Sequence, residues 1–194
     1  MKYLVAGLGN IGDEYKNTRH NIGFTILDAW AHASNISFTD KRYGFVTTAK
    51  HRGRSYVLLK PSTYMNLSGN AINYWLKKEK IPLQNLIVVV DDIALPPGSI
   101  RIKPKGGDGG HNGLEHINRI LGTSAYARMR FGVGDQFARG QQVDHVLGKW
   151  SPKELTSLQE RIDLAIEMLK SFGFIGLELT MTQYNKAGKS ENND

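Results

Sequence analysis

The sequence predicts an α/β protein, built as a single-domain three-layer α/β/α sandwich around a twisted, mixed and largely parallel sheet. Three observations support this fold class. Strand-like and helix-like segments alternate along most of the chain. The run Leu86–Val90 is apolar throughout, as expected of a strand covered on both faces. The 194 residues suit one domain with a sizeable core, and no repeat or linker divides them.

The chain begins with a strand, a loop and a helix. Tyr3–Gly7 predicts a short buried strand that runs into a glycine-rich turn. Thr18 precedes an amphipathic helix, whose apolar face consists of Ile22, Ile26, Leu27 and Trp30. Two strand-like runs, Tyr43–Lys50 and Ser55–Lys60, flank the turn residues 52–54 and predict a hairpin.

A loop from Pro61 leads to a second helix and then to the apolar run. The helical spacing is carried by Leu67, Ala71, Tyr74 and Trp75. We expect Leu86–Val90 to form the centre of the sheet. Residues 96–98 break the chain, and Ile100 and Ile102 then alternate with basic residues as a further strand. The glycines between 106 and 110 predict a mobile loop that invites a ligand and leads into a helix.

The last third of the chain predicts one more strand and a long helix. The helix after the loop carries Leu114, Ile117 and Leu121, and the strand carries Met129, Phe131 and Val133. Ser151–Glu154 supplies an N-cap, a proline at the first helical position and a capping-box glutamate. The apolar face of this helix is predicted as Leu155, Leu158, Ile162, Ala165, Ile166 and Leu169. Residues 1–185 form the predicted domain, and residues 186–194 form a polar, frayed tail.

Composition excludes several classes of protein and of site. The charged fraction of 22% and the hydrophobic fraction of 40% are those of an ordinary globular chain. No apolar run approaches the roughly 18 residues of a membrane helix, and the start is too short for a secretory signal, so we expect a cytoplasmic protein without membrane contact. The absence of cysteine excludes disulfides, thiolate nucleophiles and sulfur-ligated zinc.

The net charge of +7 is concentrated in one region. Residues 41–105 contain twelve basic and three acidic residues, whereas the rest of the chain has thirteen basic and fifteen acidic ones. This surplus fits a phosphate-binding face, and it equally fits a solvated, lysine-rich surface. Charge alone does not decide between these interpretations.

A glycine motif after the first strand resembles a dinucleotide-binding fingerprint. Residues 7–12 match GxGxxG, but the segment that follows is polar, and Asp13 and Glu14 would repel a pyrophosphate. Asp28 falls inside the predicted helix instead of at the end of a second strand. We therefore expect no NAD site here. The glycines instead allow a tight turn that exposes Asn10 at the carboxyl end of the strand.

Polar side chains stand at the ends of several predicted elements. They are Asn10, His20, Asn66, Asp91 and Asn112. A histidine beside a carboxylate takes a proton from water near neutral pH, and carboxamides donate hydrogen bonds to an oxyanion or a peptide carbonyl. Such a set hydrolyses an ester or an amide. Each residue also has a simpler role open to it, since His20 could pack or cap its helix and the asparagines could serve loops and turns.

Motifs for other hydrolytic chemistry are missing from the sequence. It contains no GxSxG, HExxH or GxxxxGK[ST]. His111 and His116 are five residues apart, which misplaces them for sharing a metal on one helical face. Serine-nucleophile, metalloprotease and NTPase chemistry are therefore all disfavoured.

Several longer strings resemble the bacterial peptidyl-tRNA hydrolase family. In chain order they are Gly7–Asn10 with Tyr15, Thr18–Gly23, Pro61–Gly69, Asp91–Asp92 with Leu95–Gly98, and Gly106–Leu114. The resemblance extends in order over most of the chain and leaves out mainly the residues after Tyr184. It implies a cytoplasmic, monomeric, cofactor-free esterase that cleaves the bond between a peptide and the 3′ ribose of tRNA, and so recycles tRNA from aborted translation.

The resemblance also implies roles for individual residues. His20 matches the general base, Asp91 the residue that keeps its imidazole basic, and Asn10 the residue tied to the water. The implied substrate contacts are Tyr15, Tyr64, Asn66 and Asn112, and the implied tRNA phosphate contacts are Lys103, Arg130 and the neighbouring Lys105. Tyr64 stands where relatives can carry Phe, and Lys105 where others can have Gly. The alternative to catalysis is a non-catalytic RNA-binding module on the same scaffold.

Overall fold

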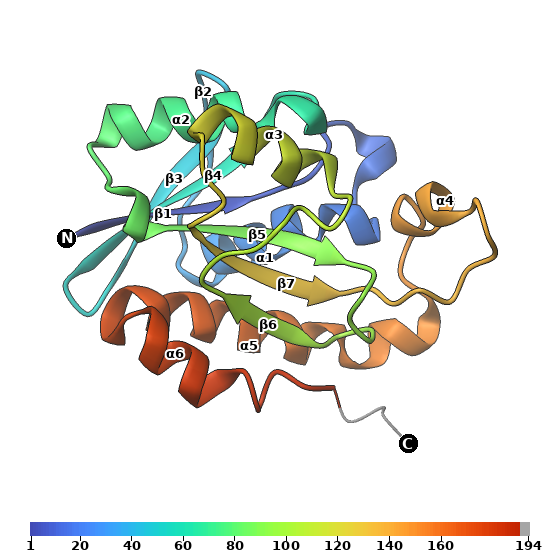
Figure 1. Ribbon diagram of the computed structural model, residues 1–194. Helices are drawn as coiled ribbons and strands as arrows, with labels where there is room; N and C mark the ends of the chain where they lie inside the picture. Colours follow the sequence, from blue (N-terminus) through green and yellow to red (C-terminus); the bar gives the residue numbers. More distant parts are fainter. Residues whose placement is uncertain (191–194) are drawn as a thin grey trace.

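The computed structural model describes residues 1–190, which form a seven-stranded sheet between helices (Figure 1). The strands are β1 (Lys2–Gly7), β2 (Thr39–Lys41), β3 (Gly44–His51), β4 (Arg54–Pro61), β5 (Leu86–Asp92), β6 (Ile100–Lys103) and β7 (Ala127–Gly132). The helices are α1 (Ile22–Ala33), α2 (Ser68–Glu79), α3 (Asn112–Leu121), α4 (Gln142–Val146), α5 (Pro152–Ile175) and α6 (Leu177–Tyr184). None of the described helices is both long and apolar enough to cross a bilayer.

The sheet has the order β2-β3-β4-β1-β5-β7-β6. Its four inner strands β4, β1, β5 and β7 are parallel. Antiparallel pairing is confined to the two sides, where β2 meets β3, β3 meets β4 and β6 meets β7. The predicted mixed, largely parallel sheet is therefore confirmed. The middle strand is β1, and the apolar run Leu86–Val90 lies beside it within β5.

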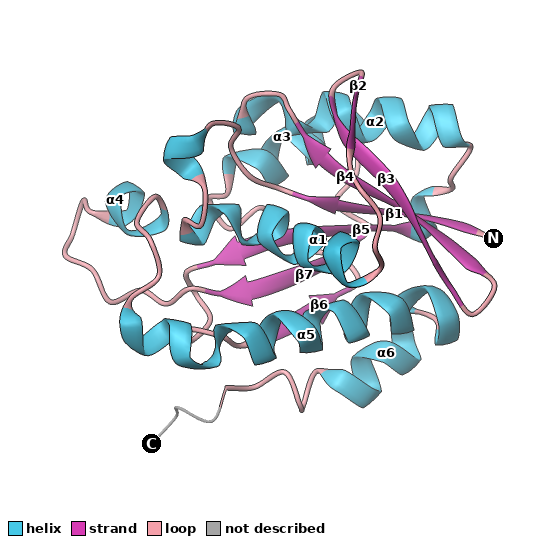
Figure 2. Ribbon diagram, turned by 180° about the vertical axis from the view of Figure 1, so that it is seen from behind, coloured by secondary structure: helices cyan, strands magenta, loops and turns pink. Residues whose placement is uncertain are grey.

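Helices cover both faces of the sheet, α2 and α3 on one side and α1 and α5 on the other (Figures 1 and 2). Alternation along β1 serves both layers. Leu4 and Ala6 pack in the core shared with α2 and α3, whereas Tyr3 and Val5 pack in the core shared with α1 and α5. The three-layer sandwich follows from this two-sided burial.

The predicted long helix α5 begins as expected. The Ser151 hydroxyl accepts from the backbone N–H of Glu154, and the Glu154 carboxylate accepts from the backbone N–H of Ser151, which completes the capping box. One predicted core position is wrong, because the side chain of Leu155 is 55% exposed. Leu155 lies in the first turn of α5 and belongs to neither hydrophobic cluster, so helical spacing alone misplaced it.

The chain beyond α6 stays attached to the sheet, contrary to a tail that frays from residue 186. The carbonyl of Gly188 accepts from the backbone N–H of Ile100 at 2.7 Å, and the Ser190 N–H donates to the hydroxyl of Ser99 at 3.2 Å. Residues 191–194 of the predicted tail lie outside the described residues.

The glycine motif after β1 leads into a single 3₁₀ turn, Asp13–Tyr15, and α1 begins only at Ile22. Gly12 has a φ of 116° and precedes this turn. A dinucleotide fingerprint needs its third glycine at the start of a helix packed on the sheet. The geometry therefore lacks the helix N-terminus that would receive a pyrophosphate.

Candidate active site

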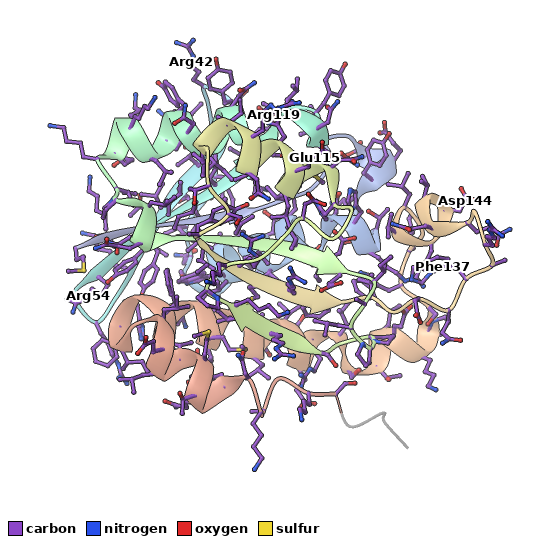
Figure 3. All side chains as sticks on the ribbon, in the orientation of Figure 1. Arg42, Arg54, Glu115, Arg119, Phe137 and Asp144 are labelled. Atoms are coloured by element: carbon purple, nitrogen blue, oxygen red, sulfur yellow. The ribbon has the colours of Figure 1, made fainter. Side chains whose placement is uncertain are left out.

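A cleft of about 280 Å³ lies at the carboxyl ends of the parallel strands. It brings together residues that sequence reasoning had selected from five separate segments, namely Asn10, His20, Asp91, Asn112 and Arg130. The segment around α4 closes one side, and it projects beyond the ends of β5 and β7 in Figure 1. Figure 3 labels Phe137 and Asp144 on this segment. Ligands of open α/β sheets bind at this edge.

His20 belongs to the 3₁₀ turn Arg19–Asn21, which is held in place by its neighbour Arg19. The Arg19 guanidinium contacts both carboxylate oxygens of Glu154 at 2.8 and 3.1 Å and donates to the carbonyl of His145 at 3.0 Å. The Arg19 backbone N–H donates to the carbonyl of Gly148. The start of α5, helix α4 and the residue Gly148 after it thus hold the turn that carries the imidazole.

Asp91 lies near the end of β5, where its carboxylate is buried under two imidazoles. His20 Nδ1 lies 2.9 and 3.0 Å from the two carboxylate oxygens. His111 Nε2 lies 3.1 Å from one of them. The two rings face each other at a centroid distance of 5.1 Å. A single buried acid therefore organises both histidines.

The proton positions in this trio follow from the helix cap. His111 is the N-cap of α3, and its Nδ1 accepts from the backbone N–H groups of Gly113 and Leu114 at 3.1 and 3.4 Å. Its proton therefore sits on Nε2 and is donated to Asp91. An ionised Asp91 also needs a donor at His20 Nδ1, which leaves the lone pair on His20 Nε2. This is the tautomer that a general base requires.

Opposing effects set the pKa values of the pair. Burial lowers the pKa of His20, but the hydrogen bond and the charge of Asp91 outweigh it, so the pKa of His20 is raised. Burial alone would raise the pKa of Asp91. Hydrogen bonds from His111 and His20 outweigh burial and lower it to about 2. Asp91 is therefore ionised at neutral pH, and it makes His20 a stronger base.

His20, Asp91 and His111 also place three ligand-type atoms within 4.8 Å of one another. Their chemistry fits a proton network better than a metal site. Metal binding at His111 Nε2 would require its proton to leave, and a proton moved to Nδ1 would meet the N–H donors of the helix cap. The donor set is therefore already committed to hydrogen bonds.

Asn10 is fixed by a neighbour of His20. The Oδ1 of Asn21 accepts from the backbone N–H of Asn10 at 2.8 Å, and its Nδ2 donates to the backbone carbonyl of Asn10 at 2.9 Å. Asn21 is only 4% exposed. The loop after β1 and the turn before α1 therefore form one unit, which holds Asn10 beside the imidazole at the cleft.

Two arginines of β7 hold the glycine-rich loop. The Gly107 carbonyl accepts from Arg128 Nη1 at 3.1 Å and from Arg130 Nη2 at 3.3 Å. Arg130 also contacts the carboxylate of Asp92 at 3.4 Å. Lys103, at the end of β6, pairs in register with Arg128, and Lys105 is exposed just after it. Neither lysine lines the cleft.

Three other predicted residues also lie outside the lining of the cleft. They are Tyr15, Tyr64 and Asn66. Tyr64 is 80% exposed, and Asn66 is exposed in the 3₁₀ turn Met65–Leu67. Met65, between them, does line the cleft. The segment therefore borders the cleft, but these three side chains do not form its wall.

Sequence reasoning missed His111 and Asn21. The five-residue spacing of His111 and His116 addresses only a shared helical face, whereas the partner of His111 is Asp91, 20 residues away. A polar residue directly before a predicted helix was the available signal, since His111 caps α3. Asn21 carried no signal beyond its position next to His20.

Comparison with known proteins identifies relatives over nearly the whole chain. A family model described as Peptidyl-tRNA hydrolase matches residues 4–193. Among curated proteins, "Peptidyl-tRNA hydrolase" from Phocaeicola vulgatus is 60% identical over 186 residues, which cover 96% of this chain and all of the relative. The protein of the same name from Geotalea uraniireducens is 39% identical and covers 94% of this chain and 95% of its own length.

Solved structures agree with these relatives. The crystal structure of peptidyl-tRNA hydrolase from Acinetobacter baumannii has a TM-score of 0.88 to this chain at 33% identity, and the match covers 94% of each chain. The seven-stranded sheet and its flanking helices are therefore shared with a protein of known structure.

Proposed function

The chain belongs to the peptidyl-tRNA hydrolase family, and we propose that His20, Asp91 and Asn10 carry out its reaction. The enzyme hydrolyses the ester bond between the peptide and the 3′ ribose of tRNA, and so releases free tRNA and peptide. The observation that supports these roles is the contact of His20 Nδ1 with both oxygens of the buried Asp91, at the wall of the cleft. It leaves an imidazole nitrogen free to take a proton.

The reaction needs only water and the side chains of the cleft. His20 Nε2 removes a proton from water as the water oxygen bonds to the ester carbonyl carbon. The resulting tetrahedral intermediate breaks its bond to the 3′ oxygen, and the imidazolium returns the proton to that oxygen. The charge of Asp91 stabilises the imidazolium in between. A general base of this kind contributes about 10²- to 10⁴-fold to the rate.

Carboxamides supply neutral hydrogen bonds around this base. We assign to Asn10 the positioning of the water, because the Asn21 contacts fix its backbone beside His20. Asn112, at the start of α3, lines the same cleft and can donate to a substrate carbonyl. Tyr15, Tyr64 and Asn66 stay proposals for contacts to the bound substrate outside the cleft wall. Because such contacts bind the peptide main chain, the enzyme would accept peptides of any sequence.

Basic residues beside the glycine-rich loop are proposed to hold tRNA. Arg130 lies in the cleft wall, and Lys103 and Lys105 lie on the segment that leads into the loop. Together they can neutralise phosphates of the acceptor stem. Contacts to phosphates do not depend on the base sequence, which suits an enzyme that accepts every tRNA.

The family also suggests how the protein works in the cell. We propose that it acts as a cytoplasmic monomer without a metal or cofactor, because its substrate arises in translation and the proton network serves the reaction by itself. Light scattering coupled to size exclusion measures the mass in solution, and a dimer would contradict the proposed monomer.

A cleavage assay with two substrates tests the proposed function. The protein is incubated with N-acetylaminoacyl-tRNA and, in parallel, with the same tRNA carrying an unblocked amino acid. We expect release of free tRNA from the blocked substrate and little release from the other. Stoichiometric binding without cleavage would instead support a non-catalytic RNA-binding module.

A further inference from the structure

A second basic surface lies away from the cleft, where the turn between β2 and β3 meets α2. The guanidinium carbon of Arg42 is 5.1 Å from the ring centroid of Tyr43 and 5.3 Å from that of Tyr74. Lys78 Nζ is 5.8 Å from the ring of Tyr74 and 5.6 Å from that of Trp75. We call these five residues the aromatic–cation platform. Four of its members reach the surface, Tyr74 only in part, and the Trp75 ring is buried beneath them.

The platform is held in place by the backbone and by a buried ring. Trp75 Nε1 donates to the carbonyl of Arg42 at 2.9 Å, which ties the turn to α2. The backbone N–H of Ser62 donates to the carbonyl of Tyr43 at 2.9 Å. Tyr43 has a φ of 65°, a conformation that an aromatic residue seldom adopts. Residues held in such an unfavourable backbone conformation cluster at functional sites.

The cations of the platform have no acidic partner within residues 1–190. No carboxylate there lies within ion-pair distance of Arg42 or Lys78. Glu79, which follows Lys78, is paired with Lys2 instead. Arg42 is exposed, and Figure 3 shows its side chain extending from the molecule into solvent. The positive charge of this surface is therefore available to an anionic partner.

The platform is separate from the proposed tRNA phosphate contacts. It adjoins β2 at one edge of the sheet, whereas Lys103 lies on β6 at the other edge. Six strand spacings of about 4.8 Å separate these edges, or roughly 29 Å. The basic surplus of the chain lies in residues 41–105. Of these basic residues, Arg42 and Lys78 belong to the platform, and Lys103 and Lys105 belong to the proposed tRNA contacts. One phosphate-binding patch therefore does not account for this charge.

We propose that the aromatic–cation platform binds a single-stranded segment of RNA, distinct from the acceptor end that enters the cleft. Arg42 and Lys78 neutralise backbone phosphates, and bases stack on the Tyr43 and Tyr74 rings and on the Arg42 guanidinium. Stacking surfaces beside cations are how proteins hold unpaired nucleic acid without reading its sequence. An acidic peptide would use the charge but leave the exposed Tyr43 ring and the partly exposed Tyr74 ring without stacking partners.

Fluorescence anisotropy with a labelled oligouridylate of about 12 nucleotides tests the proposal, at about 50 mM salt. We expect Arg42→Ala and Tyr74→Ala each to weaken binding about fivefold or more. Arg42→Lys keeps the charge but loses the planar group, so its affinity for the oligouridylate should lie between those of Arg42→Ala and the wild type. Tyr74→Phe keeps the ring and should bind like the wild type. Cleavage of peptidyl-tRNA by Arg42→Ala should keep its kcat.

Matched controls separate this surface from general charge effects. Lys50 is exposed at the opposite end of β3, and Arg130 belongs to the proposed tRNA contacts, so Lys50→Ala and Arg130→Ala should change oligouridylate affinity less than twofold. Wild-type affinity in Arg42→Ala, or an equal loss in Lys50→Ala, would overturn the proposal. An oligoglutamate that binds as tightly as the RNA would overturn the assignment to nucleic acid. These outcomes do not depend on the ester cleavage assay.

Discussion

At the residue scale, one buried carboxylate determines what His20 can do. Asp91 is 6% exposed and accepts hydrogen bonds from His20 and His111. It raises the pKa of His20 against the effect of burial. A raised pKa strengthens the base, but it also keeps more of the imidazole protonated near neutral pH. The proposed base therefore gains proton affinity, while a smaller fraction of it is in the neutral form that can accept a proton.

Replacing Asp91 by Asn should change the pH dependence of cleavage. With His20 as the proposed base, only its neutral form is active, so wild-type kcat/KM should rise with pH through a His20 pKa raised from its ordinary value. In Asp91→Asn the opposing effect of Asp91 is gone and burial dominates, so this rise should move to lower pH. The plateau should fall by about 10²-fold or more, because the imidazolium loses its counter-charge. Profiles from about pH 5 to 9 measure both effects.

Asp92→Asn is the matched control for this profile. Asp92 follows Asp91 in the chain and contacts Arg130, and no described contact joins it to His20. Its replacement should leave the rise in kcat/KM at the wild-type pH. An unchanged profile in Asp91→Asn would contradict the assigned pair.

His111 combines a structural and a positioning role, and two substitutions separate them. Ala removes the N-cap of α3 and should cost about 1 kcal/mol of unfolding free energy. Asn is a good N-cap, so His111→Asn should stay within about 0.5 kcal/mol of the wild type. Both lose the donor to Asp91, and both should lower kcat about tenfold. Denaturant unfolding and steady-state kinetics make the comparison, and full kcat in His111→Asn would exclude the positioning role.

Much of the site could be predicted from where polar residues fall in the chain. Asn10, Asp91 and Asn112 follow or precede predicted elements, and the carboxyl ends of parallel strands meet at one edge. The hydrogen bond between Asp91 and His111 could not be predicted, because it depends on how the loop 104–111 returns to the cleft. Asn66 was selected by the same rule, yet its side chain is exposed outside the cleft wall.

At the scale of elements, α1 lies so close to the sheet that one position admits only glycine. A Cβ on Gly23 would lie 2.5 Å from the backbone nitrogen of Leu8 and 2.8 Å from the carbonyl oxygen of Val89. Both atoms belong to the backbone, so neither can move aside as a side chain would. This contact sets the start of α1, and hence the turn that carries His20, against β1 and β5.

Gly23→Ala should therefore destabilise the protein by about 2 to 3 kcal/mol through overpacking. It should also lower kcat, since α1 must shift together with the His20 turn. Gly107→Ala is the control, because a Cβ there would meet nothing within 4 Å, and it should change stability by less than about 0.5 kcal/mol. Thermal or denaturant unfolding gives both values, and equal stability of the two variants would contradict the close approach.

Elements with strong local signals were predictable, and short ones were not. The capping box and a 24-residue length made α5 evident. By contrast, α4 has five residues, too few to show a helical period, and the three residues of β2 are all exposed, so no alternation marks them. Yet α4 supplies part of the cleft wall, which is why that wall was missing from the predicted site.

At the scale of the whole molecule, positive charge lies toward both edges of the sheet. The proposed tRNA contacts lie toward the β6 side, and the aromatic–cation platform lies toward the β2 side. The alternation of strands and helices was enough to predict a parallel sandwich. The strand order was not, because the placement of β1 between β4 and β5 depends on pairings between distant segments.

Removal of the proposed phosphate contacts should weaken tRNA binding in a salt-dependent way. Lys103→Ala and Arg130→Ala should raise KM with less effect on kcat, and each should reduce the slope of log affinity against log salt by about one. Lys50→Ala, on β3 toward the β2 edge of the sheet, should leave the slope unchanged. Binding to a non-cleavable tRNA over a salt series gives the slopes. Wild-type slopes in both variants would remove these residues from the tRNA interface.

The most direct measurement is the single-turnover cleavage rate of His20→Ala on N-acetylaminoacyl-tRNA. We expect a loss of at least about 10²-fold, with unchanged secondary structure and nearly unchanged tRNA affinity. His32→Ala, an exposed histidine near the end of α1, should cleave at the wild-type rate. A His20→Ala enzyme that folds normally and cleaves as fast as the wild type would contradict the role of His20 as the base.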